Sequence, residues 1–223
     1  MPPFYVTMLI EEGLIVAITP RHARSRCVRS LPLTGWQRAS MGGVAVMERV
    51  GEAFELDERL TILGRQLRAG DLAPDFALES FDPATEAIRV VRLGDSSGRV
   101  RLLNVVNSID TPVCHIETRR WDGLREDLPD EVVLFTISMD LPFAQARWRS
   151  SERVGHELLS AHKDEGFGQA YGVLVKEWRL LQRAVFVIDR ADRIVYTDYV
   201  ADQMAQPAYD AALTAAQAAV DIP

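Results

Sequence analysis

The residues best suited to chemistry are a threonine and a cysteine three positions apart, Thr111 and Cys114. They follow a largely apolar run at 102–106 and precede a polar segment, which predicts a strand, a tight loop and a helix with Cys114 in its first turn. At a helix start, N–H groups without an intrahelical partner and the positive end of the helix dipole favour thiolate over thiol. The spacing lets the Thr111 hydroxyl lie beside the sulfur and hydrogen-bond the molecule that the sulfur attacks. We therefore predict that Cys114 is a nucleophile, the alternative being an inert buried thiol.

The four histidines do not turn this cysteine into a predicted metal or protease site. His115 adjoins Cys114, but neighbours on a helix point about 100° apart. His156 and His162 are six positions apart, the wrong spacing to share a ligand on one helical face, and we interpret them as solvated or capping residues. The second cysteine, Cys27, forms no metal-binding or disulfide pattern with Cys114. The sequence predicts no metal and a reducing compartment, the cytoplasm.

The composition is that of one globular domain preceded by a basic arm. A chain of 223 residues with 48% hydrophobic residues can bury a sizeable core. Its net charge of −7 argues against nucleic acid and anionic membranes as partners. Residues 1–46 are predicted to be a disordered or non-native extension, with an organelle-targeting arm as the alternative. A secretory signal is not predicted, because the short apolar patch here precedes the arginine-rich segment and a secretory signal has the reverse order. Residues 47–223 are predicted to form the domain, and Cys27 is predicted to have no role.

Hairpins are predicted near both ends of this domain. Apolar residues alternate over 53–62 about a polar turn, which predicts a β-hairpin, and residues 88–93 predict another strand. Residues 184–188 and 193–199 predict a second hairpin around a turn rich in aspartate. An alanine-rich amphipathic helix at 209–220 closes the chain.

The centre of the domain is predicted to be a β-α-β unit. Residues 102–106 and 132–138 have the apolar character of buried parallel strands, and a helix at 115–127 joins them. Cys114 then lies just past the carboxyl end of the first strand, at the edge where sites of α/β sheets form. Asp140, two residues before a proline, is predicted to cap a second helix.

Beyond these local patterns, four segments resemble one known family. They are Asp110–Cys114, Asp140–Gln145, Gly168–Val173 and Arg183–Asp189, and they are similar to the thiol peroxidase subfamily of the peroxiredoxins. The resemblance extends over residues 53–219. It implies an α/β, thioredoxin-like fold with a central mixed sheet, flanking helices and an amino-terminal β-hairpin. It also implies a homodimer and no metal, haem or flavin cofactor.

The resemblance assigns roles to residues that the local pattern leaves open. Reduction of a hydroperoxide needs a nucleophile and donors aimed along the O–O bond. Cys114 would be the nucleophile, and Thr111 would orient the peroxide. Arg183, which alone would be interpreted as a surface charge, matches the family arginine whose guanidinium holds the thiolate and polarises the peroxide. Val113, at the helix start, and Asn107 complete the predicted set as substrate-binding residues.

Two departures from the family pattern change the expected cycle. Asn107 replaces the usual proline, which predicts a wetter loop and a less protected thiolate. Arg149, next to Trp148, occupies the position of the usual resolving cysteine, and it is interpreted either as positive potential near Cys114 or as an exposed helix arginine. The other tryptophans are interpreted as core or interface residues. We therefore predict a one-cysteine cycle with an external thiol and greater exposure to sulfinic acid, unless the arm brings Cys27 to the site.

The predicted function is a thiol-dependent peroxidase that reduces hydrogen peroxide and organic hydroperoxides. Its reductant would be a thioredoxin-like protein or a low-molecular-weight thiol. One alternative is a non-catalytic redox-sensing or interaction protein derived from a thiol peroxidase. A second alternative, a thiol transferase, is disfavoured because Thr111 stands where dithiol oxidoreductases carry a second cysteine.

Overall fold

The computed structural model describes residues 8–11, 14–17 and 46–221, which belong to two units, residues 1–42 and 43–223. In the first unit, strands β1 (Met8–Glu11) and β2 (Leu14–Ala17) pair in antiparallel fashion. Most of the predicted extension at 1–46 lies outside the described residues. Cys27 also lies outside them, so its predicted lack of a role stays a prediction.

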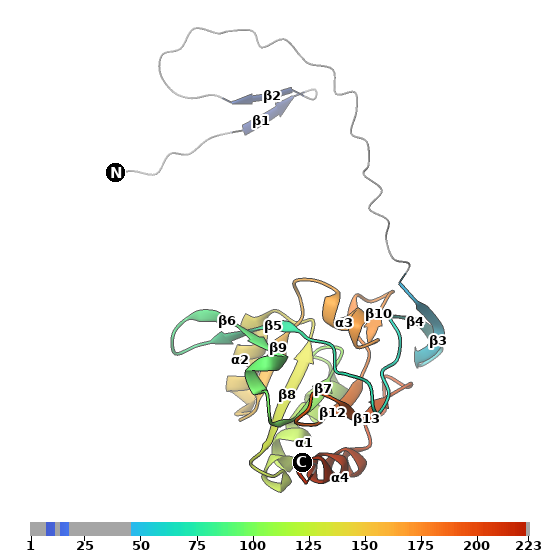
Figure 1. Cartoon of the computed structure of the whole chain (residues 1–223). Coiled ribbons are helices and arrows are strands. Elements are labelled where there is room, and N and C mark those ends of the chain that lie inside the picture. The colour runs from blue at the N-terminus through green and yellow to red at the C-terminus, as the bar shows by residue number, and fades with distance from the viewer. Residues whose placement is uncertain (1–7, 12–13, 18–45, 222–223) are drawn as a thin grey trace. The chain divides into compact units, whose positions relative to one another are not determined.

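A seven-stranded mixed sheet forms the centre of the second unit (Figure 1). Its strands are β5 (Ala77–Asp82), β6 (Ala87–Arg92), β7 (Val100–Val105), β8 (Val132–Ser138), β9 (Glu157–Ser160), β12 (Ala184–Ile188) and β13 (Ile194–Tyr199). They lie in the order β13-β12-β7-β8-β9-β5-β6, with β7, β8 and β9 parallel and the other neighbours antiparallel. The predicted central strands and the predicted carboxy-terminal hairpin are confirmed.

The central strand β7 is buried along its whole length because the sheet carries a core on each face. Leu103 packs on one face with Tyr171 and Phe186. Leu102 packs on the other face with Trp121, in a cluster that also includes alanines of the last helix. Both faces of β7 are therefore covered, which explains why its sequence is an apolar run rather than an alternating one.

Four α-helices accompany this sheet. They are α1 (Pro112–Leu124), α2 (Pro142–Glu152), α3 (Gly166–Ala170) and α4 (Tyr209–Val220), and short 3₁₀ turns η1 (Leu93–Ser96) and η2 (Arg125–Asp127) precede β7 and follow α1. The helix predicted at 115–127 corresponds to α1 and η2, and α4 has the predicted bounds. Within the described ranges, no helix is both long and apolar enough to span a membrane.

The predicted capping of α2 by Asp140 is wrong. The cap residue of α2 is Leu141, which makes no side-chain cap hydrogen bond. The Asp140 carboxylate instead accepts hydrogen bonds from the Ser108 hydroxyl at 2.7 Å and from the Ile109 N–H at 2.9 Å. These hydrogen bonds tie the end of β8 to the loop after β7.

A separate four-stranded sheet contains the predicted amino-terminal hairpin. Its strands are β3 (Glu48–Glu55), β4 (Glu58–Leu63), β10 (Leu174–Val175) and β11 (Leu180–Leu181), in the order β11-β10-β4-β3. The hairpin is confirmed, and its turn consists of two residues because Glu55 pairs with Glu58. Pairing of β4 with β10 joins the beginning of this unit to a segment more than a hundred residues later.

Two glycines allow the backbone segments next to β4 and β10 to approach closely, at a contact that we call the joint. Gly64 and Gly172 both have positive φ, +93° and +61°. A Cβ on Gly64 would overlap the carbonyl oxygen of Gln169, and a Cβ on Gly172 would overlap that of Arg65. The Arg49 guanidinium donates to the carbonyl oxygens of both glycines. The backbone-to-backbone approach therefore requires glycine at both positions.

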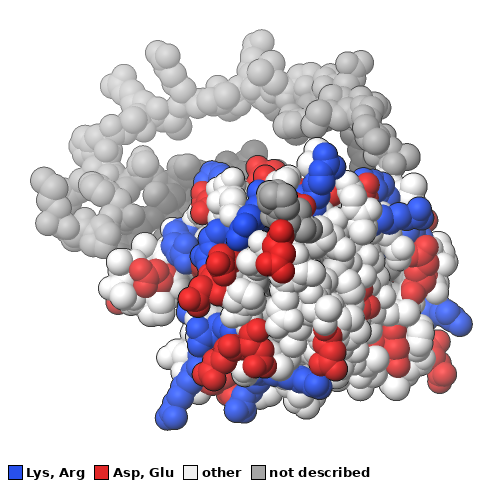
Figure 2. Space-filling model, turned by 60° about the horizontal axis from the view of Figure 1, so that its bottom comes forward, with Lys and Arg blue, Asp and Glu red and all other residues white. Residues whose placement is uncertain are grey.

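The surface of this unit carries charges of both signs. Figure 2 shows basic and acidic side chains interspersed around a largely uncharged area on one face. No field of a single sign extends over that face, so electrostatic attraction there is local to individual groups.

Candidate active site

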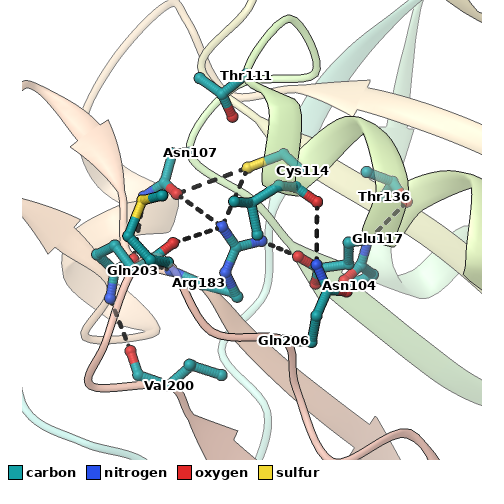
Figure 3. A network of polar contacts seen from close by, with 12 residues as sticks. Asn104, Asn107, Thr111, Cys114, Glu117, Thr136, Arg183, Val200, Gln203 and Gln206 are labelled. Atoms are coloured by element: carbon teal, nitrogen blue, oxygen red, sulfur yellow. Dashed lines mark hydrogen bonds and ion pairs between the residues drawn. The ribbon is translucent and has the colours of Figure 1, made fainter. Parts of the chain in front are cut away.

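Cys114 lies in the first turn of α1, which begins directly after the loop that leaves β7 (Figure 3). Pro112 occupies the start of the helix, where its fixed φ is favourable and its missing N–H costs nothing. The first backbone hydrogen bond of the helix runs from the His115 N–H to the Thr111 carbonyl, at 2.9 Å. The N–H groups of Val113 and Cys114 precede it, in the turn where a helix offers no backbone acceptor. The sulfur is thus placed as the sequence predicts, in a residue with no solvent exposure.

Arg183 reaches the sulfur because β12 pairs with β7. Arg183 directly precedes β12, and Ala184 is the register partner of Val105 at the end of β7. Its Nη2 donates to Cys114 Sγ at 3.4 Å and to the Gln203 carbonyl oxygen at 2.9 Å. Arg183 is 1% exposed, so the structure brings together the predicted nucleophile and the predicted arginine from 69 residues apart.

Glu117 is a member of this site that sequence reasoning missed. It is fully buried and forms an ion pair with Nη1 of Arg183, whereas the other terminal nitrogen, Nη2, contacts the sulfur (Figure 3). Its position three residues after Cys114 places both side chains on one face of α1. That spacing is the sequence signal that could have identified it, because a carboxylate on the buried face of a helix needs a cation.

Asn107 faces the sulfur from the loop after β7. Its Oδ1 lies 3.6 Å from Cys114 Sγ and 3.4 Å from Arg183 Nη2. Its Nδ2 donates to the carbonyl oxygen of Leu181 at 2.7 Å and to Gln203 Oε1 at 3.1 Å. The expectation of a wetter, less protected thiol is wrong, because protein groups satisfy this amide and both Asn107 and Cys114 are buried.

Gln203 also escaped prediction. It lies in the segment after β13, is 2% exposed, and its Nε2 donates to the Val200 carbonyl oxygen at 2.7 Å. Its Oε1 accepts from the Arg183 N–H at 2.9 Å as well as from Asn107. A glutamine in a polar loop carries no sequence signal of burial, since the partners that bury it are remote in the chain.

Thr111 sits at the cap position of α1, on the same side of the helix start as the sulfur (Figure 3). Its hydroxyl makes no cap hydrogen bond and donates instead to the Ser108 carbonyl oxygen, at 2.9 Å. The hydrogen of this hydroxyl is therefore engaged, and its lone pairs remain available as acceptors.

A cleft of about 340 Å³ opens over this arrangement. Its walls are formed by Glu55, Asn107, Thr111, Pro112, Val113, Trp178, Leu180, Arg183, Gln203 and Met204. The four predicted partners of the cysteine all line it. Trp178 also lines the cleft, so it is not confined to the core or an interface as interpreted from the sequence. Trp148 is buried in a cluster with Cys114, and its Nε1 donates to His115 Nδ1 at 3.2 Å.

Arg149 does not direct its charge at the sulfur. Its guanidinium donates to the carbonyl oxygens of Val154 and Gly155, at 3.2 and 2.9 Å, and so closes the carboxyl end of α2. Cys114 is the only cysteine in the described part of the chain.

His156 is not the solvated or capping residue that the sequence suggests. It is 4% exposed, with Nδ1 3.2 Å from Asp122 Oδ1 and Nε2 2.8 Å from the Thr136 hydroxyl. Burial lowers the pKa of His156 below its ordinary value, and the hydrogen bond with His156 is the main cause that lowers the pKa of Asp122 to about 2. The ring is thus held neutral, donating to the carboxylate and accepting from the threonine.

Comparison with known proteins connects this geometry with a family. The model of the AhpC/TSA family matches residues 69–197. A thiol peroxidase of Halalkalibacterium halodurans is 44% identical over 162 residues, which cover 72% of this chain and 94% of that protein. A thiol peroxidase of Listeria monocytogenes is 45% identical over 161 residues, covering 72% of this chain and 94% of that protein.

Solved structures share the architecture. A peroxiredoxin-like protein from Aquifex aeolicus superposes with a TM-score of 0.67 at 27% identity, over 78% of this chain and 98% of that chain. A thiol peroxidase from Chromobacterium violaceum superposes with a TM-score of 0.64 at 24% identity, over 71% of this chain and 91% of that chain. The predicted α/β, thioredoxin-like fold with its central mixed sheet is confirmed.

Proposed function

The chain belongs to the AhpC/TSA family, and from that premise we propose that it reduces hydroperoxides with Cys114 as the nucleophile and without a resolving cysteine. It is a thiol-dependent peroxidase, with a hydroperoxide as substrate and a thiol as reductant. The observation that carries the residue assignment is the contact between Cys114 Sγ, at the start of a helix, and Nη2 of Arg183 at 3.4 Å, since Arg183 also lines the cleft.

In the proposed first step, the Cys114 thiolate attacks the outer oxygen of the hydroperoxide. The O–O bond breaks, the sulfur becomes a sulfenic acid, and the departing oxygen takes a proton and leaves as water or an alcohol. The Arg183 guanidinium stabilises the charge that moves from sulfur to the departing oxygen, because Nη2 already contacts the sulfur.

Thr111 and the helix start would align the substrate. Since the Thr111 hydroxyl gives its hydrogen to the Ser108 carbonyl, its lone pairs can accept the O–H of the peroxide. The N–H groups of Val113 and Cys114 would donate to the peroxide oxygens. Asn107, which lines the same cleft, would also contact the substrate.

The second half of the cycle would use an external thiol. Arg149 stands where a resolving cysteine would be expected, and its side chain is occupied at the end of α2. A thiolate of the reductant attacks the sulfenic sulfur, water leaves, and a second thiol reduces the resulting mixed disulfide. We further propose a homodimer that acts in the reducing cytoplasm, where such thiols are maintained.

Chemical trapping tests this proposal. The reduced protein is treated with one equivalent of hydrogen peroxide beside a sulfenic-acid trap, and the adduct is located by intact mass and peptide mapping. We expect an adduct at Cys114 within seconds, loss of peroxide consumption in Cys114→Ser, and unchanged consumption in Cys27→Ser. An unmodified Cys114 would favour the non-catalytic alternative, and a Cys27–Cys114 disulfide would contradict the one-cysteine cycle.

A further inference from the structure

We propose that Asn107 is the acceptor that keeps the oxidised cysteine in its protonated sulfenic acid form and thereby slows its further oxidation to sulfinic acid. This inference rests on the proposed function, because it concerns the product of the first peroxide reaction. It gives Asn107 a task distinct from binding substrate. It also addresses a difficulty of a one-cysteine cycle, in which the sulfenic acid must survive until an external thiol arrives.

The orientation of the Asn107 amide is fixed by its surroundings. Nδ2 donates to two oxygens, the Leu181 carbonyl and Gln203 Oε1. The Gln203 amide cannot be reversed either, since its Oε1 accepts from the Arg183 N–H and its Nε2 donates to the Val200 carbonyl oxygen. A reversed Asn107 would place its oxygen against these two acceptors and its NH₂ group against a guanidinium. The oxygen of Asn107 must therefore face the sulfur.

The distance between the two atoms suits a hydroxyl on the sulfur. Asn107 Oδ1 lies 3.6 Å from Cys114 Sγ. One S–O bond and one O–H···O hydrogen bond of about 2.7 Å span that gap when they meet at an angle close to tetrahedral. A sulfenic acid hydroxyl carries its hydrogen at such an angle. Oδ1 can therefore accept from the product hydroxyl with no movement of Asn107.

The protonation state of the product determines how fast it is oxidised again. In over-oxidation, the sulfur of the sulfenate anion attacks a second hydroperoxide. The O–O bond breaks, the sulfur loses two more electrons to become sulfinate, and the departing oxygen takes a proton and leaves as water or an alcohol. A carbonyl-type acceptor binds the protonated hydroxyl and repels the anion, so it lowers the fraction of sulfenate.

Arg183 does not cancel this effect. Its guanidinium favours an anionic product, as it favours the thiolate, because Nη2 contacts the sulfur. However, the buried Glu117 forms an ion pair with it, and the Gln203 carbonyl oxygen also accepts from Nη2. Asn107 Oδ1 is the additional group that distinguishes the protonated from the ionised product.

Over-oxidation of the full chain tests the inference. Wild type and two variants, Asn107→Leu and Asn107→Pro, receive graded excesses of hydrogen peroxide without reductant, and mass spectrometry follows the gain of one and then two oxygens at Cys114. Leucine has nearly the shape of asparagine without its acceptor, and proline is the residue usual in the family. We expect the second oxidation to be faster by up to about tenfold in both variants, the worth of one hydrogen bond. We also expect the pH midpoint of the second oxidation to be lower in both variants, because the sulfenic acid then ionises more readily. Loosened packing would not produce this shift.

A matched control separates this role from general disruption. Asn104→Leu removes another buried amide three residues earlier, whose Nδ2 donates to the Thr136 hydroxyl at 3.1 Å and not to the cysteine. We expect over-oxidation of this variant at the wild-type rate and pH midpoint. If Asn107→Leu and Asn107→Pro form sulfenic acid but over-oxidise like wild type, the inference fails while the proposed function stands. If wild type forms no sulfenic acid, the proposed function itself fails.

Discussion

At the scale of single residues, the charge of Arg183 is balanced within the protein. Both Arg183 and Glu117 are buried, and the ion pair between them leaves Nη2 to contact the sulfur and the Gln203 carbonyl oxygen. A buried cation without its partner is costly because the interior cannot replace the lost hydration. Glu117 therefore acts through Arg183, as a positioning residue rather than a catalytic one.

Removing this carboxylate should have a large effect on stability. Glu117→Ala leaves the Arg183 guanidinium buried and uncompensated, so we expect the free energy of unfolding to fall by about 3–5 kcal/mol. Chemical denaturation followed by fluorescence measures this change. Peroxide reduction by Glu117→Ala should also slow. Without the ion pair at Nη1, the Arg183 guanidinium is no longer held in the orientation in which Nη2 contacts the sulfur.

A surface ion pair provides the comparison. Glu48 pairs with Lys176 at 2.7 Å, and both side chains are about half exposed. Glu48→Ala should cost less than about 1 kcal/mol, as expected of a solvated pair. Equal losses in the two variants would contradict the view that burial makes the Glu117 pair essential.

At the scale of elements, the joint at Gly64 and Gly172 holds the amino-terminal hairpin against the rest of its sheet. Alanine at Gly172 would drive its Cβ into the Arg65 carbonyl oxygen, in addition to the strain of a positive φ. Because the obstacle is backbone rather than a flexible side chain, the strands must separate to relieve it.

We expect Gly172→Ala to lower the free energy of unfolding by several kcal/mol more than Gly70→Ala. Gly70 is the control, since its φ of +96° is also positive but a Cβ there meets nothing within 4 Å. The control should lose about 1–2 kcal/mol from φ alone. Similar values for the two variants would mean that β4 and β10 can separate slightly at no cost.

The elements themselves were largely predictable, because each depends on local patterns. Apolar runs identified β7 and β8, and the alanine-rich period identified α4. The misinterpretation of Asp140 has a physical cause. A carboxylate before a helix usually caps it, but here a loop from another strand supplies better donors.

Of the candidate site, the sequence predicted only the residues that belong to the motif of Thr111 and Cys114 or to the family resemblance. Cys114, Thr111 and Arg183 carried recognisable signals. Gln203 carried none and Glu117 carried only its spacing from Cys114, because their roles arise when β12 and the segment after β13 pack beside α1. Burial of His156 depended in the same way on partners that sequence periodicity cannot identify.

At the scale of the whole molecule, stability should depend on pH through the buried His156 and Asp122. The folded state keeps His156 neutral, whereas the unfolded chain binds a proton near pH 6.5, its ordinary pKa. Stability from this residue is therefore complete above pH 6.5 and is lost as pH falls below it. Asp122 contributes in the same direction at lower pH, with stability lost between its ordinary pKa of 3.8 and about 2.

Replacement of the ring should flatten the upper part of this profile. In His156→Gln, we expect the slope of unfolding free energy with pH just below 6.5 to fall by up to about 1.4 kcal/mol per pH unit. Urea denaturation across a pH series measures it. A slope unchanged in His156→Gln would show that other groups control acid unfolding.

The separation of 69 positions between Cys114 and Arg183 also has a consequence in time. Ribosomes add about 5–20 residues each second, so the cysteine is made roughly 3–14 s before its arginine exists. Leu181, whose carbonyl fixes Asn107, is made just before Arg183, and Gln203 is made later still. During synthesis the thiol therefore has neither its activating cation nor its protective cover. If Cys114 is the nucleophile that we propose, its site is therefore assembled only after Arg183 and Gln203 have been made, and a growing polypeptide that lacks them is not yet a peroxidase.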